Sequence, residues 1–545
     1  MDTLLFNGNV LTMESEGRAS AVAFQNGRVA AVGDSKALLA EAGAQTARYD
    51  LEGRTVVPGF IDAHAHIWKI GHLLTSMLDL RGVTSIEDLN AAVLKHHAKL
   101  PPGDWLQGRG FNEAAMAERR KPTRYDLDKA VSGRPVVLTR TCGHIFVANS
   151  AALKLAGIST QTQAPVGGVI ERDEHGEPNG ILHETAMGLI TRVMPPPTAA
   201  NFGKMIRAAL EHQLSLGITS SADCGVTPEL LNVYLDLDRR GELPARVLVM
   251  PLRRVDGRTD PVPLPKKHVS DRLRVDTVKF LADGGLSGAT AALSVRYRHS
   301  DTKGTLRFDR EDLRALCQES HDRGWRIATH AIGDVAIDQV LGIYESLGPH
   351  PEGLTHRIEH FGLPSAIQLN RAAALGVISV PQTIFIRELG RNFLEFVPDQ
   401  FLPRTYPIRA MLDAGLTVAL SSDAPVVEND NPLAGMAAAI TRRTNEGIAI
   451  APEQAISAQE ALYGYTMAGA IASGETANRG SIHPGKWADI AILSADPLAT
   501  DPEALPEIRV DMTFVAGRKV YQRPAELYYE RNCNMLGSDG NQEKG

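Results

Sequence analysis

Short apolar segments alternate with helical segments through most of this 545-residue chain, and this alternation limits the folds open to it. After residue 203 the helical segments carry apolar side chains at helical spacing, as at Ile206, Leu210 and Leu214. The expected strands are one that begins at Val56 and, after it, 218–222, 247–250, 277–281, 326–329, 357–359, 377–380 and 417–420. Eight strand–helix units over about 370 residues predict an α/β fold, a (β/α)8 TIM barrel that carries an insertion.

The first expected strand ends in two histidines separated by one residue. Residues 56–66 form a mostly apolar run that suits a strand buried on both faces. Alternate side chains of a strand point the same way, so His64 and His66 project together and can bind one divalent metal ion. The chain contains 17 histidines, and at this abundance such a pair arises by chance in about one chain of two. The pair therefore needs partners from other strands to predict a metal site.

Reactive side chains recur in four further expected strands. Lys279 lies in one strand, His330 and His360 end two others, and Asp423 follows the last. Active sites of barrels lie at the C-terminal ends of the strands. Taken singly, each histidine could be an ordinary hydrogen-bonded residue, and Asp423 could cap the next helix. Four histidines, one lysine and one aspartate on a single rim instead predict a metal centre.

Two regions fall outside this alternation. Residues 3–12 and 20–33 predict a small antiparallel sheet, because Asn26-Gly27 between apolar runs is a strong hairpin signal. Residues from about 67 to 205 contain an expected helix at 85–100, capped by Ser85, and a strand that ends at His144. We expect this region to be an insertion over the mouth of the barrel. His144 either faces the pocket or has an ordinary structural role.

Composition excludes several classes of protein. The net charge of −7 and the pI near 6.2 give no basic surface for nucleic acid. No apolar run is long enough to span a membrane, and the start of the chain lacks the basic region of a signal peptide. The four cysteines are scattered, which indicates a reduced, cytoplasmic protein and no Cys-rich zinc module. A small molecule is the expected partner, and a homodimer is compatible with the sequence.

Five motifs together resemble the metal-dependent amidohydrolase superfamily. They are residues 58–66, 278–284, 330–334, 356–360 and 421–425. Within the superfamily the chain is similar to amidohydrolase family 3, the YtcJ-like branch that includes N-substituted formamide deformylases. The resemblance covers nearly the whole chain. It implies a barrel at 56–475, a small β-sandwich domain built from both termini at 1–55 and 476–523, and a polar C-terminal tail at 524–545.

The resemblance also implies a binuclear metal centre, with two Zn²⁺ ions or similar divalent metals. The implied ligands are His64, His66, Lys279, His330, His360 and Asp423. Lys279 would be a carboxylated lysine, whose CO2-derived carbamate bridges the two ions in place of a repelling ammonium. Asp423 would be the catalytic residue that takes a proton from the attacking water and returns it to the departing nitrogen.

The implied activity is hydrolysis of non-peptide carbon–nitrogen bonds, in small amides or N-substituted formamides, by a metal-activated hydroxide. Two alternatives stay open: a mononuclear deaminase of an amino-heterocycle with Lys279 uncarboxylated, and a non-catalytic, metal-stabilised binding protein. The residues expected to shape the substrate pocket are Trp68, His144 and Phe385. Those expected to orient the histidines are Asp62, Asp334 and Glu359, although Asp334 could equally cap a helix.

Overall fold

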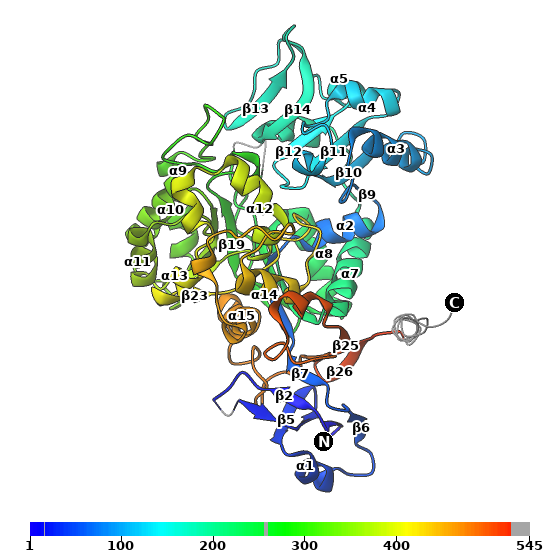
Figure 1. The fold of residues 1–545 in the computed structure, drawn as a ribbon, viewed down its shortest axis with the longest axis vertical. Coiled ribbons are helices and arrows are strands. Elements are labelled where there is room, and N and C mark those ends of the chain that lie inside the picture. The colour runs from blue at the N-terminus through cyan, green and yellow to red at the C-terminus, as the bar shows by residue number, and fades with distance from the viewer. Residues whose placement is uncertain (16, 256–259, 525–545) are drawn as a thin grey trace, which may run out of the picture.

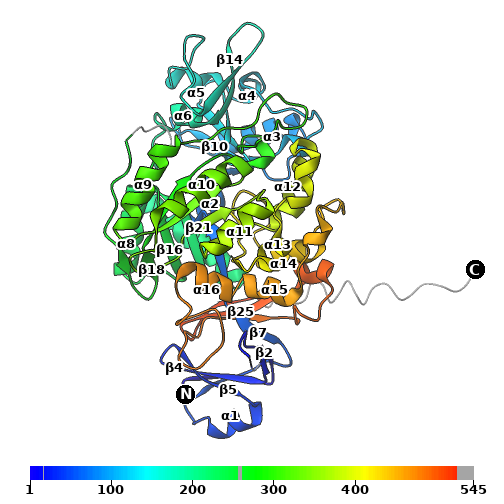
Figure 2. The same cartoon turned by 90° about the vertical axis from the view of Figure 1, so that its left-hand side faces the viewer.

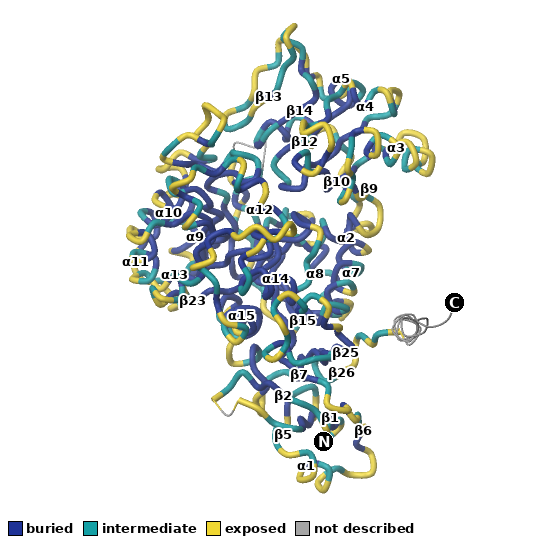
Figure 3. Tube along the Cα trace, viewed as in Figure 1, coloured by how far each residue is buried: buried dark blue, intermediate teal, exposed yellow. Residues whose placement is uncertain are grey.

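The computed structural model describes residues 1–15, 17–255 and 260–524 of the chain. It is a mixed α/β structure whose parts follow one another along its long axis (Figure 1). Two sheets lie at one end, parallel strands surrounded by helices lie in the middle, and a further sheet lies at the other end. Buried residues concentrate in the middle part (Figure 3). The expected polar tail lies, beyond Pro524, outside the described residues.

All eight expected strands are present in the middle part. They form two sheets, in which the order is β17-β18-β16-β15-β8 and β19-β20-β21-β22-β23. The strands are β8 (Phe60–Ala65), β15 (Ile218–Val226), β16 (Arg246–Pro251), β19 (Thr277–Leu281), β20 (Arg326–Ala331), β21 (Arg357–His360), β22 (Ile378–Val380) and β23 (Thr417–Val418), with β17 (His268–Val269) and β18 (Leu273–Val275) at one edge. Apart from β17, neighbouring strands within each sheet run parallel.

The two parallel sheets are hydrogen-bonded to each other at two places. The Arg253 amide donates to the Lys279 carbonyl at 3.2 Å, which joins the end of β16 to β19. The Asp423 amide donates to the His64 carbonyl at 2.8 Å, which joins the segment after β23 to β8. Figure 2 shows helices lying outside the strands. The main ones are α7 (Ala199–Ser215), α8 (Pro228–Arg239), α9 (Arg310–Asp322), α10 (Asp334–Leu347), α11 (Ala366–Ala374) and α13 (Ile408–Asp413).

The strand expected to begin at Val56 is divided in two. β7 (Thr55–Pro58) pairs antiparallel with β24 (Ile490–Leu493), whereas β8 begins at Phe60 and pairs with β15. Between them, the Gly59 amide donates to the Asp489 carbonyl and the Phe60 amide to the Gly217 carbonyl. A Cβ on Gly59 would lie 2.2 Å from Thr219 Oγ1, so glycine lets the chain pass closely from one sheet to the other.

Two sheets pack together at the N-terminal end of the molecule. One has the order β5-β4-β1-β6, and the other has the order β26-β25-β24-β7-β2-β3. Their strands are β1 (Thr3–Phe6), β2 (Asn9–Leu11), β3 (Arg18–Ala19), β4 (Ala21–Gln25), β5 (Arg28–Gly33), β6 (Ala47–Asp50), β25 (Val510–Val515) and β26 (Arg518–Gln522). Phe24 of the first sheet and Phe514 of the second meet edge to face, with ring centroids 5.8 Å apart.

The prediction that the first 33 residues form a single antiparallel sheet was wrong. β1 and β2 belong to different sheets, and β1 also pairs parallel with β6. The expected hairpin is confirmed: β4 and β5 are joined by Asn26 and Gly27, which both have positive φ.

The region from residue 78 to 184 forms a sheet of its own, with the order β13-β14-β12-β11-β10-β9. Its strands are β9 (Leu78–Asp79), β10 (Leu106–Phe111), β11 (Val136–Arg140), β12 (Ile145–Ala148), β13 (Gly168–Arg172) and β14 (Pro178–Glu184). The expected helix is α3 (Ile86–His97), and the Ser85 side chain caps it by accepting from the Asp88 amide. Two hydrophobic clusters, separate from that of the parallel strands, hold this sheet and its helices together.

No helix among the described residues has the length and apolar character needed to cross a bilayer.

Candidate metal centre and its cavity

Six polar side chains meet at the C-terminal ends of the parallel strands. They line a single cavity of about 160 Å³. The six are His64, His66, Lys279, His330, His360 and Asp423. The structure thus brings together every residue that the sequence suggested as a metal ligand.

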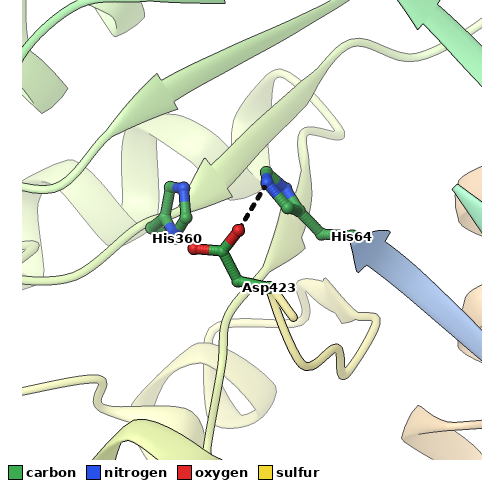
Figure 4. A group of neighbouring side chains, drawn as sticks. All are labelled: His64, His360 and Asp423. Carbon is green, nitrogen blue, oxygen red and sulfur yellow. Dashed lines mark ion pairs between the residues drawn. The ribbon is translucent and has the colours of Figure 1, made fainter. Parts of the chain in front are cut away.

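The histidines and Asp423 are close enough to share an ion. Asp423 Oδ1 lies 3.1 Å from His66 Nε2 and 3.4 Å from His64 Nε2. One donor atom from each of His64, His360 and Asp423 lies within 4.8 Å of the others, and Figure 4 shows these three side chains facing one another. The His330 and His360 ring centroids are 4.4 Å apart. This spacing suits one or two divalent ions.

Three buried polar atoms in this group form no hydrogen bond with any described residue. They are Lys279 Nζ, His66 Nδ1 and Asp423 Oδ1. Buried polar groups are nearly always paired, so each such atom needs an explanation. A bound ion and a modified lysine would supply the missing partners, and the donor set of imidazole and carboxylate is the one that zinc prefers. The residues present therefore fit a metal centre.

Burial sets the protonation state that metal binding requires. Desolvation, with Lys279 nearby, holds the pKa of His64 well below 6.5, and desolvation likewise lowers the pKa of His66 to about 4. Burial alone would raise the pKa of Asp423, but the neighbouring histidines outweigh it and keep the pKa below its ordinary value. Neutral imidazoles and an ionised carboxylate are the forms that coordinate metals.

Two of these residues have backbone conformations that L-residues rarely adopt. The φ angle is 69° at His360 and 55° at Asp423. Such conformations are costly, by about 1–3 kcal/mol each, and cluster at functional sites where surrounding structure enforces them. Here they turn both side chains into the cavity at the ends of their strands.

Neighbouring carboxylates and an amide hold the histidine rings. Glu359 Oε2 lies 2.5 Å from His64 Nδ1, and Arg357 in turn donates to Glu359. Gln382 Oε1 lies 2.6 Å from His360 Nδ1. Hydrogen bonds of this kind fix the tautomer of a ligating histidine and leave its other nitrogen for the metal.

The other residues expected to orient histidines act differently. Asp62 accepts hydrogen bonds from the Ser422 hydroxyl and from the His64 amide, so it connects β8 to the segment that carries Asp423. Asp334 lies in the first turn of α10 and accepts from the Ser294 amide and hydroxyl.

Asp283, in contrast, lies 3.3 Å from His330 Nε2. Cys224 also lines the cavity, but burial raises the pKa of its thiol, which disfavours the thiolate needed for metal binding.

Two of the three residues expected to shape the pocket line the cavity, and the third does not. His144 and Phe385 line the cavity, whereas Trp68 is absent from its lining and packs edge to face on Phe202, with ring centroids 5.6 Å apart. Trp68 belongs to α2 (Ile67–Thr75), which packs on α7, so its side chain serves helix packing. The apolar part of the lining includes Phe385, Leu389 and Phe393.

Sequence reasoning missed several polar residues in or beside the cavity. Lys69, Arg254 and Arg307 line it, and three others act on the site more directly. Glu184 Oε2 lies 2.9 Å from His144 Nδ1, Gln382 holds His360, and Arg109 lines the cavity itself. Glu184 ends β14 and Arg109 lies near the end of β10, so the strand-end rule used for the barrel would also have flagged them in the inserted sheet. Gln382 lies two residues after β22, another strand end.

Comparison with known proteins agrees with this geometry. Residues 48–521 match the amidohydrolase family. The chain is 30% identical to a putative amidohydrolase YtcJ of Bacillus subtilis, over 96% of this chain and 100% of that protein. It is 31% identical to N-substituted formamide deformylase of Arthrobacter pascens, over 96% of this chain and 98% of that protein.

Among solved structures, an uncharacterised metal-dependent hydrolase of Pyrococcus horikoshii superposes with a TM-score of 0.74 at 28% identity, and the match covers 92% of this chain and 99% of that one. Atrazine chlorohydrolase TrzN of Arthrobacter aurescens, solved with zinc, shares the fold at 15% identity and a TM-score of 0.53, over 98% and 99% of the two chains. The chain therefore belongs to the amidohydrolase family, and it is a hydrolase that acts on carbon–nitrogen bonds.

Proposed function

We propose that the protein hydrolyses small amides of the N-substituted formamide type at a centre of two divalent metal ions, zinc being the first candidate. The observation that carries this proposal is the group of three buried polar atoms in the cavity that lack a hydrogen bond: Lys279 Nζ, His66 Nδ1 and Asp423 Oδ1, the last of which faces His64 and His66. The similarity to N-substituted formamide deformylase supports the substrate class. A merely structural histidine cluster would have its nitrogens paired.

In this proposal the two parallel sheets close into one (β/α)8 barrel of residues 56–475. The hydrogen bonds from Arg253 to Lys279 and from Asp423 to His64 support closure, since they connect the two sheets on both sides, through β16 and β19 and through β8 and the segment after β23. The two N-terminal sheets form a β-sandwich domain from 1–55 and 476–523, and the region at about 67–205 is the insertion. Barrel closure is what would bring all six candidate ligands to one rim.

Each candidate ligand has its own role in the proposed centre. His64, His66 and Asp423 would hold one ion, and His330 and His360 the other. Lys279 would connect them as a carbamate, because a buried ammonium without a hydrogen-bond partner would repel both ions. Bound divalent ions would lower the pKa of water and polarise the substrate carbonyl.

Asp423 is placed to move the proton. It lies against His64 and His66, and the Ser422–Asp62 hydrogen bond holds the segment that carries it. In the proposed reaction it takes a proton from the attacking water and gives it to the leaving nitrogen. Glu359 and Gln382 keep His64 and His360 in the tautomer that leaves one nitrogen free for binding.

The first test is the metal content of protein purified without chelator and with bicarbonate present. We expect about two equivalents per chain, as in two-metal hydrolases, and a loss of metal when Lys279→Ala is measured in the same way. Hydrolysis of N-benzylformamide and similar N-formyl amines should depend on that metal. Protein that binds no metal after reconstitution would refute the proposal.

A mononuclear deaminase is the second candidate. It is favoured by one observation, that His64, His360 and Asp423 form a compact three-residue group. In that case the metal content would be about one equivalent and would not change in the Lys279→Ala variant. Amino-heterocycles, rather than formamides, would then be the substrates to test.

A further inference from the structure

Arg109 is a buried cation on the wall of the catalytic cavity. Its side chain extends from β10 of the inserted sheet, and the residue is 5% exposed. Its Nε donates to the Pro425 carbonyl at 3.2 Å and its Nη2 to the Thr141 carbonyl at 3.2 Å. Pro425 comes two residues after Asp423, so these bonds fix the guanidinium beside the segment that carries the proposed proton carrier.

Four other buried arginines of the described chain have carboxylate partners, namely Arg140, Arg246, Arg253 and Arg357. Arg140 pairs with Glu113 at 2.8 Å, and Arg357 pairs with Glu359 at 2.8 Å. Arg109 forms no ion pair within the described residues, and burial lowers the pKa of its guanidinium to about 10. An uncompensated buried charge is costly, and one that lies in a cavity is a candidate for binding a ligand of opposite charge.

Lack of a carboxylate partner is not by itself enough, as Arg442 shows. That residue is also fully buried and bonds to backbone carbonyls, but it does so through Nε, Nη1 and Nη2 together. Arg442 does not line the cavity, whereas Arg109 does, and the backbone hydrogen bonds of Arg109 use Nε and Nη2 but not Nη1. Arg109 thus has N–H groups left to donate to a ligand in the cavity, whereas Arg442 presents none there.

A second donor, His144, follows a glycine that packs against Arg109. A Cβ on Gly143 would be 3.2 Å from Arg109 Nη2, so the guanidinium packs closely against this glycine, and His144 follows it. The His144 ring lines the same cavity and lies 5.9 Å from the His330 ring, centroid to centroid. Glu184, which also lies 3.2 Å from Arg307 Nη1, lies 2.9 Å from His144 Nδ1 and orients the ring.

We propose that Arg109, with His144 beside it, binds a carboxylate of the substrate, so that the preferred substrates are N-formyl amino acids or similar amides that carry an anion near the scissile bond. This rests on the proposed function and specifies its substrate class. The planar fork of a guanidinium matches a carboxylate in two parallel hydrogen bonds. The apolar residues Phe385, Leu389 and Phe393 would receive an apolar side chain of the same substrate.

The test compares two probes that differ in one group, racemic N-formylphenylalanine and racemic N-formylphenylalaninamide, on metal-loaded full-length protein. The readout is the ratio of kcat/KM for the acid to that for the amide. A desolvated, hydrogen-bonded charge pair is worth roughly 30-fold or more, so we expect a ratio of at least that size. Arg109→Gln should bring the ratio to within roughly 3-fold of unity, and Arg109→Lys should give an intermediate ratio because it keeps the charge without the fork.

The exposed residue Arg239 supplies the matched control, since Arg239→Gln removes one positive charge away from the cavity and should leave the ratio unchanged. Thermal unfolding of each variant identifies any that do not fold. A wild-type ratio near unity, or an unchanged ratio in folded Arg109→Gln, would overturn the subsite.

Hydrolysis of N-benzylformamide tests the proposed function separately from the subsite. If neither formylphenylalanine probe is hydrolysed, calorimetry with the same two probes still decides the subsite. Tighter binding of the acid that disappears in Arg109→Gln supports the subsite, and equal binding of acid and amide refutes it.

Discussion

Two groups of histidines lie at opposite ends of the parallel strands, and they differ in how their ring nitrogens are paired. At the N-terminal ends, buried His321 and half-buried His350 and His356 meet edge to face, with ring centroids within 5.3 Å of one another. Every ring nitrogen of these three has a partner: His321 Nδ1 faces His356 Nε2, and the others bond to backbone groups. At the C-terminal ends, His66 Nδ1 has none among the described residues.

Because the two groups differ in the pairing of their ring nitrogens, clustering and burial of histidines do not by themselves mark a catalytic site. Burial lowers the pKa of histidines in both groups, as for His64 in one and for His356 in the other, where the pKa is about 3. The paired group stabilises the connection between α9 and the strands that follow it. The group with unpaired donors, which also contains Lys279 and Asp423, is the one poised to bind something that the chain does not supply.

The largest expected effect is on turnover at the unpaired group. Asp423→Asn keeps an oxygen donor but cannot carry the proton, and loss of a general base lowers rates by about 10²–10⁴-fold. We expect kcat for a formamide substrate to fall by that factor, with the melting temperature little changed. Steady-state kinetics on variant protein of verified metal content measure it. Activity within roughly 3-fold of wild type would remove Asp423 from the proton-transfer role.

The reverse pattern is expected for the paired group. His356→Leu would leave the Ile327 amide and His321 Nδ1 without partners, and each loss is worth about 1–3 kcal/mol. We therefore expect a fall of about 2–4 kcal/mol in the free energy of unfolding, measured by urea denaturation, while kcat of the folded variant stays near wild type. A large loss of kcat in folded protein would contradict the structural role.

The pH dependence sharpens this prediction. Because the pKa of folded His356 is about 3, the folded protein keeps the imidazole neutral while the unfolded chain takes up a proton near pH 6.5. Stability should therefore fall as pH drops from 6.5 towards 3. His356→Leu removes this contribution, so the decline of stability with acid should be shallower in the variant than in wild type.

A smaller effect is expected at Lys279 in the metal-free protein. Its Nζ is buried with no hydrogen-bond partner among the described residues, and such a group costs about 1–3 kcal/mol. Lys279→Met should raise the free energy of unfolding of the chelator-treated protein by that amount while weakening metal binding. Isothermal titration with zinc and urea denaturation measure the two effects. Destabilisation of the metal-free variant would show that the ammonium already has a stabilising partner.

Much of the rim could be predicted because its information is local. Each of the eight strands is a short apolar run bounded by helix or turn signals, and the residue at its end follows directly from the alternation. His64, His330, His360 and Asp423 were found in this way. The division of the first strand at Pro58-Gly59 was missed, although the proline and glycine were visible, because apolarity alone does not tell which sheet a strand joins.

The wall of the cavity could not be predicted in the same way, since it depends on contacts between distant parts of the chain. Arg109 is anchored to Pro425, 316 residues away, and Gln382 holds His360 from another strand end. The expectation that Trp68 lines the pocket differs from the structure for a related reason. It lies close to the metal centre in sequence, but the packing of α2 on α7 turns it towards Phe202.

The smallest expected effect concerns His144 and Glu184, a third arrangement in which a half-buried histidine is charged. Glu184 raises the pKa of His144 to about 9, so the pair stabilises the fold fully below pH 6.5 and loses this contribution as pH rises through 9. Glu184 has its pKa lowered to about 2, so its contribution is present above pH 4.5 and is lost only in strong acid. His144→Gln should therefore destabilise the protein by about 1–2 kcal/mol at pH 6 and by less at pH 9.5. Urea denaturation of both proteins at the two pH values measures this, and a pH-independent difference would mean that His144 is neutral and acts through packing alone.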